Sequence, residues 1–214
     1  FNTGGTLTNN GTINVSATGD LSAQNLNNVT TLTLTGDATL PNSTSDMPGA
    51  INIASNAVTV ATSADLSGVT LSNLGNLTVD GSQTLTLTLA QWEAFSLGTI
   101  TKNGSLALNA SGDLSAKDLS SINTLILTGD ATLPNSTSDM PSAINAASNA
   151  VTVAASADLS GVTLSNLGNL TVDAGQTLTL TAAQATAFNT GGTLTNNGTI
   201  NVSATGNLSA ENLN

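Results

Sequence analysis

The chain has 214 residues and a formal net charge of −11, with 13 Asp and Glu against two Lys and Arg, and it contains no His or Cys. So few cations argue against nucleic acids and anionic membrane surfaces as partners, because both are bound by clustered Lys and Arg. No base of suitable pKa accompanies the many serines, and we expect no enzymatic activity. Hydrophobic residues make up 39% of the chain, which indicates a packed core rather than disorder. No apolar run reaches the roughly 18 residues of a membrane-spanning helix, so no membrane insertion is expected.

A long internal repeat is the strongest feature of the sequence. Residues 1–27 return as 188–214 with two changes, Asp20 to Asn207 and Gln24 to Glu211. A second stretch matches its copy at 53 of 61 positions, namely residues 35–95 against 128–188. The long period is therefore 93 or 94 residues, which divides the chain into 1–94, 95–187 and a partial unit, 188–214.

Each long unit contains a shorter and more degenerate repeat of about 47 residues. An Asp-Leu-Ser triplet marks it, beginning at Asp20, Asp65, Asp113 and Asp158. Residues 1–214 are therefore predicted to form one continuous repeat array. The array starts and stops inside a unit, without the polar cap that closes a natural array, and we expect it to be a fragment of a longer protein.

The expected secondary structure is a series of short strands separated by turns. Apolar residues alternate strictly with Thr, Ser or Ala in the segments 31–35, 57–60, 84–88, 105–108 and 177–181. Such alternation directs Leu and Val to one face of a sheet and the other residues to the opposite face. Gly and Asn in the intervening corners suit tight turns, because they tolerate positive φ.

One helix is predicted, over residues 89–95, with Thr88 as its N-cap. The counterpart of this segment in the other half-unit, residues 43–51, contains Pro48. There we expect one or two turns that bulge from the path of the chain.

The fold class predicted from these patterns is all-β, a parallel β-solenoid built of tandem repeats. Strands this short bury little alone, but coils of 19–24 residues stacked on one another would join their Leu and Val into one apolar column. At about 4.8 Å per coil, some nine or ten coils would give a rod of about 45 Å. The alternative is an array of antiparallel β-sandwich domains, which predicts hairpin turns at Asn10-Gly11 and Asn103-Gly104.

Two stretches near the end of the chain carry a family resemblance. Residues 158–188 read DLSGVTLSNLGNLTVDAGQTLTLTAAQATAF, and residues 191–206 read GGTLTNNGTINVSATG. In style they resemble the repeat regions of giant cell-surface proteins of Gram-negative bacteria, the adhesin-like and haemagglutinin-like proteins. The resemblance extends over the whole chain and implies export, a stalk or surface-layer role, and contact with cells or matrix. The calcium-binding nonapeptide Gly-Gly-x-Gly-x-Asp of many such proteins is missing, because neither Gly4-Gly5 nor Gly191-Gly192 continues into it.

Two kinds of aspartate stand out as candidate sites. Asp37, Asp80, Asp130 and Asp173 recur at turns, where stacked coils could gather carboxylates and carbonyls around Ca²⁺; the alternative is an ordered corner without metal, and no other cofactor is expected. The Asp-Leu-Ser aspartates are predicted to cap corners by accepting hydrogen bonds from backbone N–H groups.

Candidate contact surfaces are two repeated loops and one aromatic residue. The loops span 41–48 and 134–141, with Pro41, Asn42, Asp46, Pro134, Asn135 and Asp139 as the contact residues. Trp92 is the single Trp of the chain and could serve as a carbohydrate platform or simply pack with Phe95. Thr-x-Thr strands on a flat face are also a pattern of ice-binding proteins, with a plain solvated face as the alternative.

The function expected from the sequence is mechanical. The chain would be a stalk, spacer or surface-layer segment of a large secreted bacterial surface protein, located outside the cell. An adhesin module that contacts glycans or host surfaces through the repeated loops is the alternative, and ice binding is a third. End-to-end self-association is a further expectation, because the exposed ends of a solenoid are unpaired sheet edges.

Overall fold

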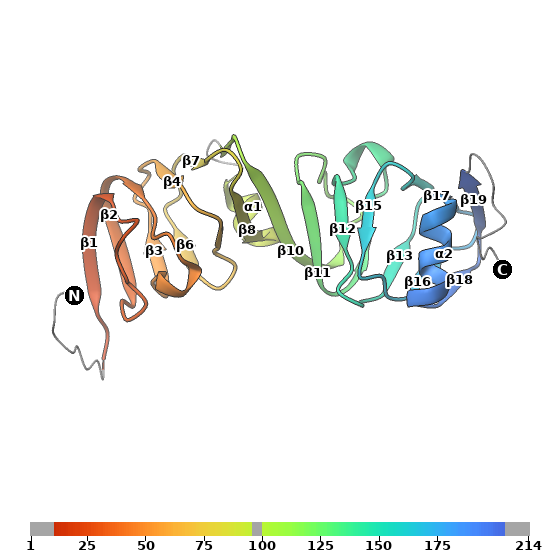
Figure 1. Ribbon diagram of the computed structural model, residues 1–214, viewed down its shortest axis with the longest axis horizontal. Helices are drawn as coiled ribbons and strands as arrows, with labels where there is room; N and C mark the ends of the chain where they lie inside the picture. Colours follow the sequence, from red (N-terminus) through yellow and green to blue (C-terminus); the bar gives the residue numbers. More distant parts are fainter. Residues whose placement is uncertain (1–10, 96–99, 204–214) are drawn as a thin grey trace. The chain divides into compact units, whose positions relative to one another are not determined.

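A computed structural model describes residues 11–95 and 100–203 of the chain (Figure 1). The chain divides into two compact units, residues 1–107 and 108–214. Both units are built mainly of short strands, and β10 (Ser105–Asp113) contains the division between them. No helix in the described ranges is long and apolar enough to cross a membrane.

The first unit contains nine strands before β10 among its described residues. In one sheet the order is β6-β3-β2-β4-β7-β9, with β1 also pairing with β2, while β5 pairs with β8. The strands are β1 (Asn14–Asp20), β2 (Thr31–Thr39), β3 (Ala50–Asn52), β4 (Val58–Val60), β5 (Ala64–Asp65), β6 (Thr70–Ser72), β7 (Leu77–Val79), β8 (Thr84–Thr88) and β9 (Ile100–Lys102).

The second unit repeats this plan 93 residues later. Its β11 to β17 begin and end 93 residues after β2 to β8, and two further strands follow. In this unit β11 pairs with β12 and β13, β12 with β15, and β13 with β16, which pairs with β18; β17 lies between β14 and β19. The strands are β11 (Thr124–Thr132), β12 (Ala143–Asn145), β13 (Val151–Val153), β14 (Ala157–Asp158), β15 (Thr163–Ser165), β16 (Leu170–Val172), β17 (Thr177–Thr181), β18 (Leu194–Asn196) and β19 (Thr199–Ser203).

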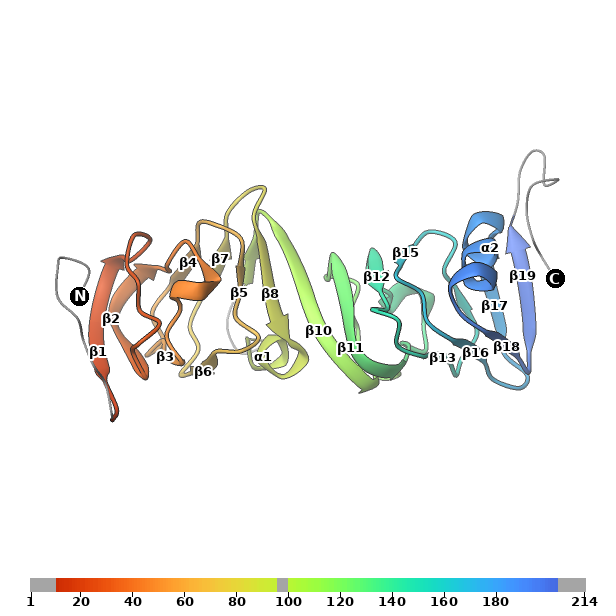
Figure 2. The same ribbon diagram turned by 60° about the horizontal axis from the view of Figure 1, so that its bottom comes forward.

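Strand pairing within each unit is parallel, and it joins segments about 20 residues apart. The separations run from 17 residues, for Asn14 and Thr31, to 24, for Leu170 and Leu194. Figure 2, a turned view of the same chain, shows β1, β2 and β3 of the first unit one after another. The antiparallel alternative is therefore wrong for these ladders.

The hairpin expected at Asn103-Gly104 is likewise not formed. The preceding strand β9 pairs with β7, whereas Ser105 donates its backbone N–H to Gln83 O at 2.7 Å. The turn is thus a corner between different partners rather than a hairpin. Asn10 lies outside the described residues.

The core of each unit is formed by inward-facing Leu, Val and Ile from successive coils. Leu32, Leu85 and Leu170 are fully buried, and the described residues include no buried polar or charged side chain. Along β8 and β17 the two Leu side chains are buried while the Thr side chains between them are not. The predicted alternation is confirmed, and the apolar side chains form a dry interior while Thr faces solvent.

A short helix closes each long repeat against the coil before it. The predicted helix is confirmed as α1 (Leu89–Ala94), and its N-cap Thr88 forms a capping box with Gln91. The Gln91 Nε2 group also donates to Leu66 O at 2.7 Å and Val69 O at 2.8 Å. One glutamine therefore starts the helix and ties it to the previous coil.

The equivalent helix of the second unit is longer. It is α2 (Ala182–Gly191), with Thr181 and Gln184 in the same capping box. Gln184 Nε2 donates to Leu159 O and Val162 O, both at 2.8 Å. The same tie therefore recurs 93 residues later.

Asparagine side chains satisfy carbonyls at one interior corner of each unit. Asn56 Nδ2 donates to Leu34 O at 3.1 Å and to Ile53 O at 2.9 Å. Its counterpart, Asn149, makes the same two bonds to Leu127 O and Ala146 O. Because the acceptor of the first bond belongs to the preceding coil, these amides hold neighbouring coils in register.

We expect adjacent residues of β16 to differ sharply in their contribution to stability. Leu170→Ala should lower the free energy of unfolding by about 3 kcal/mol, because it leaves a cavity in the column. Thr171→Ala, on the solvent face one residue later, should change it by less than about 0.5 kcal/mol. Urea denaturation followed by circular dichroism measures both, and equal effects would contradict the assignment of the two faces.

Candidate functional site

The Asp-Leu-Ser aspartates cap corners of the chain, as predicted. In each case Asp Oδ1 accepts a hydrogen bond from the backbone N–H two residues later. The distances are 2.9 Å for Asp20 and Ser22, 2.8 Å for Asp65 and Ser67, 2.9 Å for Asp113 and Ser115, and 2.8 Å for Asp158 and Ser160. These carboxylates therefore have a structural role at the corner.

Hydrogen bonding also shifts the acidity of several of these groups. The pKa values of Asp20, Asp113 and Asp158 lie below the ordinary value, mainly because a Ser hydroxyl two residues later donates to the carboxylate, with the backbone N–H second. Asp118, which accepts from Ser120 in the same way, also has a lowered pKa. All four groups are exposed, so each is charged at neutral pH and lies on the outside of its unit.

The candidate calcium ligands do not stack on one another. Asp37 Oδ1 accepts from the Ala57 N–H at 2.8 Å, and Asp130 Oδ1 accepts from the Ala150 N–H at the same distance. Asp80 follows β7, where its own N–H donates to Val60 O at 3.1 Å, and Asp173 follows β16 in the same way.

The strand register keeps the two aspartates of the first unit apart. Asp37 immediately precedes Ala38, which pairs with Val58, and Val58 pairs in turn with the first residue of strand β7. Asp80 instead follows Val79, at the last position of strand β7. Two candidates therefore lie at different ends of this stack of strands rather than side by side. Over the described ranges, no three acidic side chains gather to form a metal site.

The two repeated loops are anchored to the coils at their ends and exposed between them. Pro41 and Pro48 are buried, and the segment between them contains a single 3₁₀ turn, Thr44–Asp46. Asn42 is exposed and accepts from the Thr62 hydroxyl at 2.8 Å, while Asp46 O accepts from the Leu26 N–H at 2.8 Å. The predicted turn is present, and the buried prolines and Met47 pack the ends of the segment against the coil while Thr44 and Ser45 between them are exposed.

The loop of the second unit has the same arrangement. Pro134 and Pro141 are buried, Asn135 is exposed, and Asp139 Oδ1 accepts from the Ser138 hydroxyl at 3.1 Å. Trp92 lies on α1 as a half-buried side chain.

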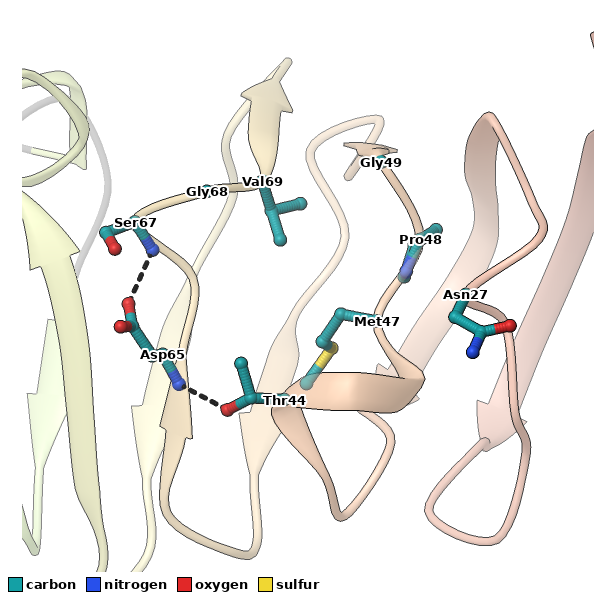
Figure 3. A pocket seen from close by; sticks show the side chains of 9 residues that line it. All are labelled: Asn27, Thr44, Met47, Pro48, Gly49, Asp65, Ser67, Gly68 and Val69. Atoms are coloured by element: carbon teal, nitrogen blue, oxygen red, sulfur yellow. Dashed lines mark hydrogen bonds between the residues drawn. The ribbon is translucent and has the colours of Figure 1, made fainter.

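A shallow depression of about 470 Å³ opens beside the first loop (Figure 3). Met47 and Val69 point into it from facing segments, and both are almost fully buried. On the rim Thr44 Oγ1 accepts from the Asp65 N–H at 2.9 Å. The lining residues are Asn27, Thr44, Met47, Pro48, Gly49, Asp65, Ser67, Gly68 and Val69.

The depression combines an apolar floor with a rim of hydroxyl, amide and carboxylate groups. A Cβ built on Gly68 would meet nothing within 4 Å, so the absence of a side chain there leaves the depression open. This combination suits a small polar molecule with an apolar face, such as a sugar ring. Sequence reasoning missed the depression because its residues come from three segments that only the coil register brings together.

The rim recurs in the second unit. Thr137 Oγ1 accepts from the Asp158 N–H at 2.9 Å, and Asp158 Oδ1 accepts from the Ser160 N–H at 2.8 Å. Gly161, like Gly68, has nothing within 4 Å of a Cβ position. One such arrangement therefore occurs per 93-residue repeat.

Threonines form a column along one sheet of the first unit. The register pairs Thr39 with Thr59, Thr59 with Thr78, and Thr78 with Thr101. The strands β4, β7 and β9 have three residues each, so each presents one outward Thr rather than a Thr-x-Thr pair. The strands β4, β7 and β9 thus add one hydroxyl row beside the Thr31 and Thr33 positions of β2, and ice binding stays a prediction from the sequence pattern.

Comparisons with known proteins identify no relative. No protein-family model matches the chain, no curated protein matches it, and no solved structure matches it. The site residues must therefore be interpreted from their geometry alone.

We expect acid to destabilise the protein through its corner aspartates. Their pKa values are lower when folded than the ordinary value of 3.8, so this contribution to stability is full above about pH 4 and is lost as the pH falls through the folded values. Replacing Asp20, Asp113, Asp118 and Asp158 by Asn keeps an oxygen acceptor but removes the titration. Urea denaturation followed by circular dichroism should show a small loss of stability of the variant near pH 7 and a smaller fall in its stability than in that of the parent as the pH is lowered through the folded values, so that the two chains converge in acid. An equal fall for both chains would contradict the role of these groups.

Proposed function

We propose that the chain is a segment of a parallel β-solenoid that serves as a stalk, spacer or surface layer of a large secreted bacterial surface protein. The observation that supports this best is the ladder pattern. Parallel pairing at separations of 17 to 24 residues is what successive coils of a solenoid produce. The dry interior of Leu, Val and Ile is the column that such coils would share.

The mechanical role follows from the direction of the bonds. In a solenoid, backbone hydrogen bonds between coils run along the long axis, so each added repeat extends the shaft without a new folding problem. Few charges and an outer layer of Thr, Ser and Asn limit strong attachment along the sides. Near-identical repeats suit this role, because a spacer needs copies of one unit rather than variety. Its location would be extracellular.

The second candidate is an adhesin module for glycans. The depression lined by Met47, Val69 and Asp65 favours it, because the same rim recurs once per long repeat. Two weak sites in one chain would allow multivalent binding. Here the contact surface would be the depression beside each loop rather than the loop tips.

The spacer proposal predicts a linear relation between repeats and length. At about 4.8 Å per coil and four to five coils per 93 residues, adding one long repeat to the chain should extend it by about 20 Å. Small-angle X-ray scattering of chains with zero, one and two added repeats measures the maximum dimension. An increase in the maximum dimension well below about 20 Å per added repeat, as compact globules would give, would contradict the proposal.

A glycan array distinguishes the two candidates. The spacer proposal predicts no reproducible binding by the full chain. Binding that is lost when Gly68→Val adds a side chain at the depression and Gly161→Val adds one at the equivalent position of the second unit would favour the adhesin module instead. These substitutions suit the purpose because the added side chains start in open space, and Gly68→Ala with Gly161→Ala gives a milder matched control.

A further inference from the structure

The first and last described strands of the chain share the sequence Asn-Val-Ser. Residues Asn14-Val15-Ser16 open β1, and residues 201–203, also Asn-Val-Ser, close β19. They belong to the segments 1–27 and 188–214, which differ at two positions. The chain therefore holds two copies of one segment, in two different settings.

The two settings are complementary. In β1, Asn14, Val15 and Ser16 pair with Thr31, Leu32 and Thr33 of the following strand β2. In β19, the three residues Asn201, Val202 and Ser203 pair with Thr179, Leu180 and Thr181 of the preceding strand β17. One copy of the segment thus shows how it binds the strand after it, and the other shows how it binds the strand before it.

Both copies leave one strand edge open within the described residues. Here β1 pairs with β2 alone, and β19 pairs with β17 alone. Val202 is the one exposed large hydrophobic residue of the described chain, at 37% exposure, although its ladder partner Leu180 is fully buried. The apolar column is therefore uncovered at β19, where an added strand would bury it.

We propose that two copies of this chain join head to tail by sharing one copy of the repeated segment, which lies between β17 of one molecule and β2 of the next. The register of the junction follows from the two ladders. Leu180 of one molecule, the Val of the shared segment and Leu32 of the next would form one continuous apolar row. Thr179, the Asn and Thr31 would form the matching outer row.

This exchange conserves the strand pairing. Before joining, one molecule has its β17–β19 ladder and the next has its β1–β2 ladder; afterwards one segment makes both ladders and the redundant copy is released. The released segment regains conformational entropy, while the apolar surface covered on the shared valine is offset by the valine of the released copy. This gain opposes the entropy lost on association, as in other cases of exchange of identical elements between protomers. The proposed exchange depends only on the β1–β2 and β17–β19 ladders, so it is independent of whether the chain acts as a spacer.

Charge substitutions in the two valines test the exchange. The parent chain should form head-to-tail oligomers on incubation below its unfolding temperature, because one end segment must detach first. Val202→Asp weakens β19 on its own β17 and leaves that edge open to the intact β1 segment of another molecule. Association should therefore become roughly three- to tenfold faster. Val15→Asp together with Val202→Asp leaves no segment able to enter the column, and this chain should stay monomeric.

Sedimentation velocity and light scattering against time and concentration measure these outcomes. Asn201→Asp is the matched control, since it adds the same charge one residue away on the solvent face and should behave like the parent chain. Circular dichroism verifies that each variant keeps its strands. If the chains associated only through nonspecific hydrophobic contact at Val202, the Val202→Asp chain would associate more slowly than the parent chain, and that result would overturn the proposal. A parent chain that stays monomeric at all concentrations would also overturn it.

Discussion

The structure depends on a single constraint, the parallel pairing of segments about 20 residues apart. Since side chains alternate across a strand, a slip of one residue would turn every inward Leu and Val to solvent. The register that places Leu32 beside Ile51 therefore also places Thr33 beside Asn52 on the outside. The core, the threonine column and the separation of Asp37 from Asp80 all follow from this one pairing.

Side-chain hydrogen bonds complete what the ladders leave open at the corners. The side-chain amides of Asn56 and Gln91 donate to backbone carbonyls of the preceding coil. The corner aspartates accept from the backbone N–H two residues later, as Asp65 does from Ser67. No buried side-chain nitrogen or oxygen of the described residues lacks a partner. Burying an unpaired polar group is costly, so hydrogen bonding of polar side chains at the corners lets a chain rich in Asn keep the interior of its described residues apolar.

Local patterns predicted the strands and the helix start, because alternation and the Thr88 cap depend on neighbours in sequence. They failed where distant coils decide the outcome. The turns were expected to place Gly or Asn at positive φ, yet Ala54 and Ser55 have φ of 52° and 62°, since the ladders on either side force the corner to close there. Packing against the coil also buries Pro41 and Pro48, which a sequence pattern does not reveal. The depression beside them is formed by three segments and exists only in the assembled register.

A repeated register has a consequence for association as well as for stability. The two copies of the repeated segment pair with β2 and with β17 in the same alternation of apolar and polar residues, and the proposed exchange rests on this match. The sides of the units differ, because exposed carboxylates such as Asp20, Asp65 and Asp158 line their corners. At physiological salt these charges act over about 8 Å, far enough to oppose close lateral contact between negatively charged chains. If the chains join as proposed, the exposed Val202 makes the β19 edge the apolar surface of contact, whereas the charged corners oppose association through the sides of the units.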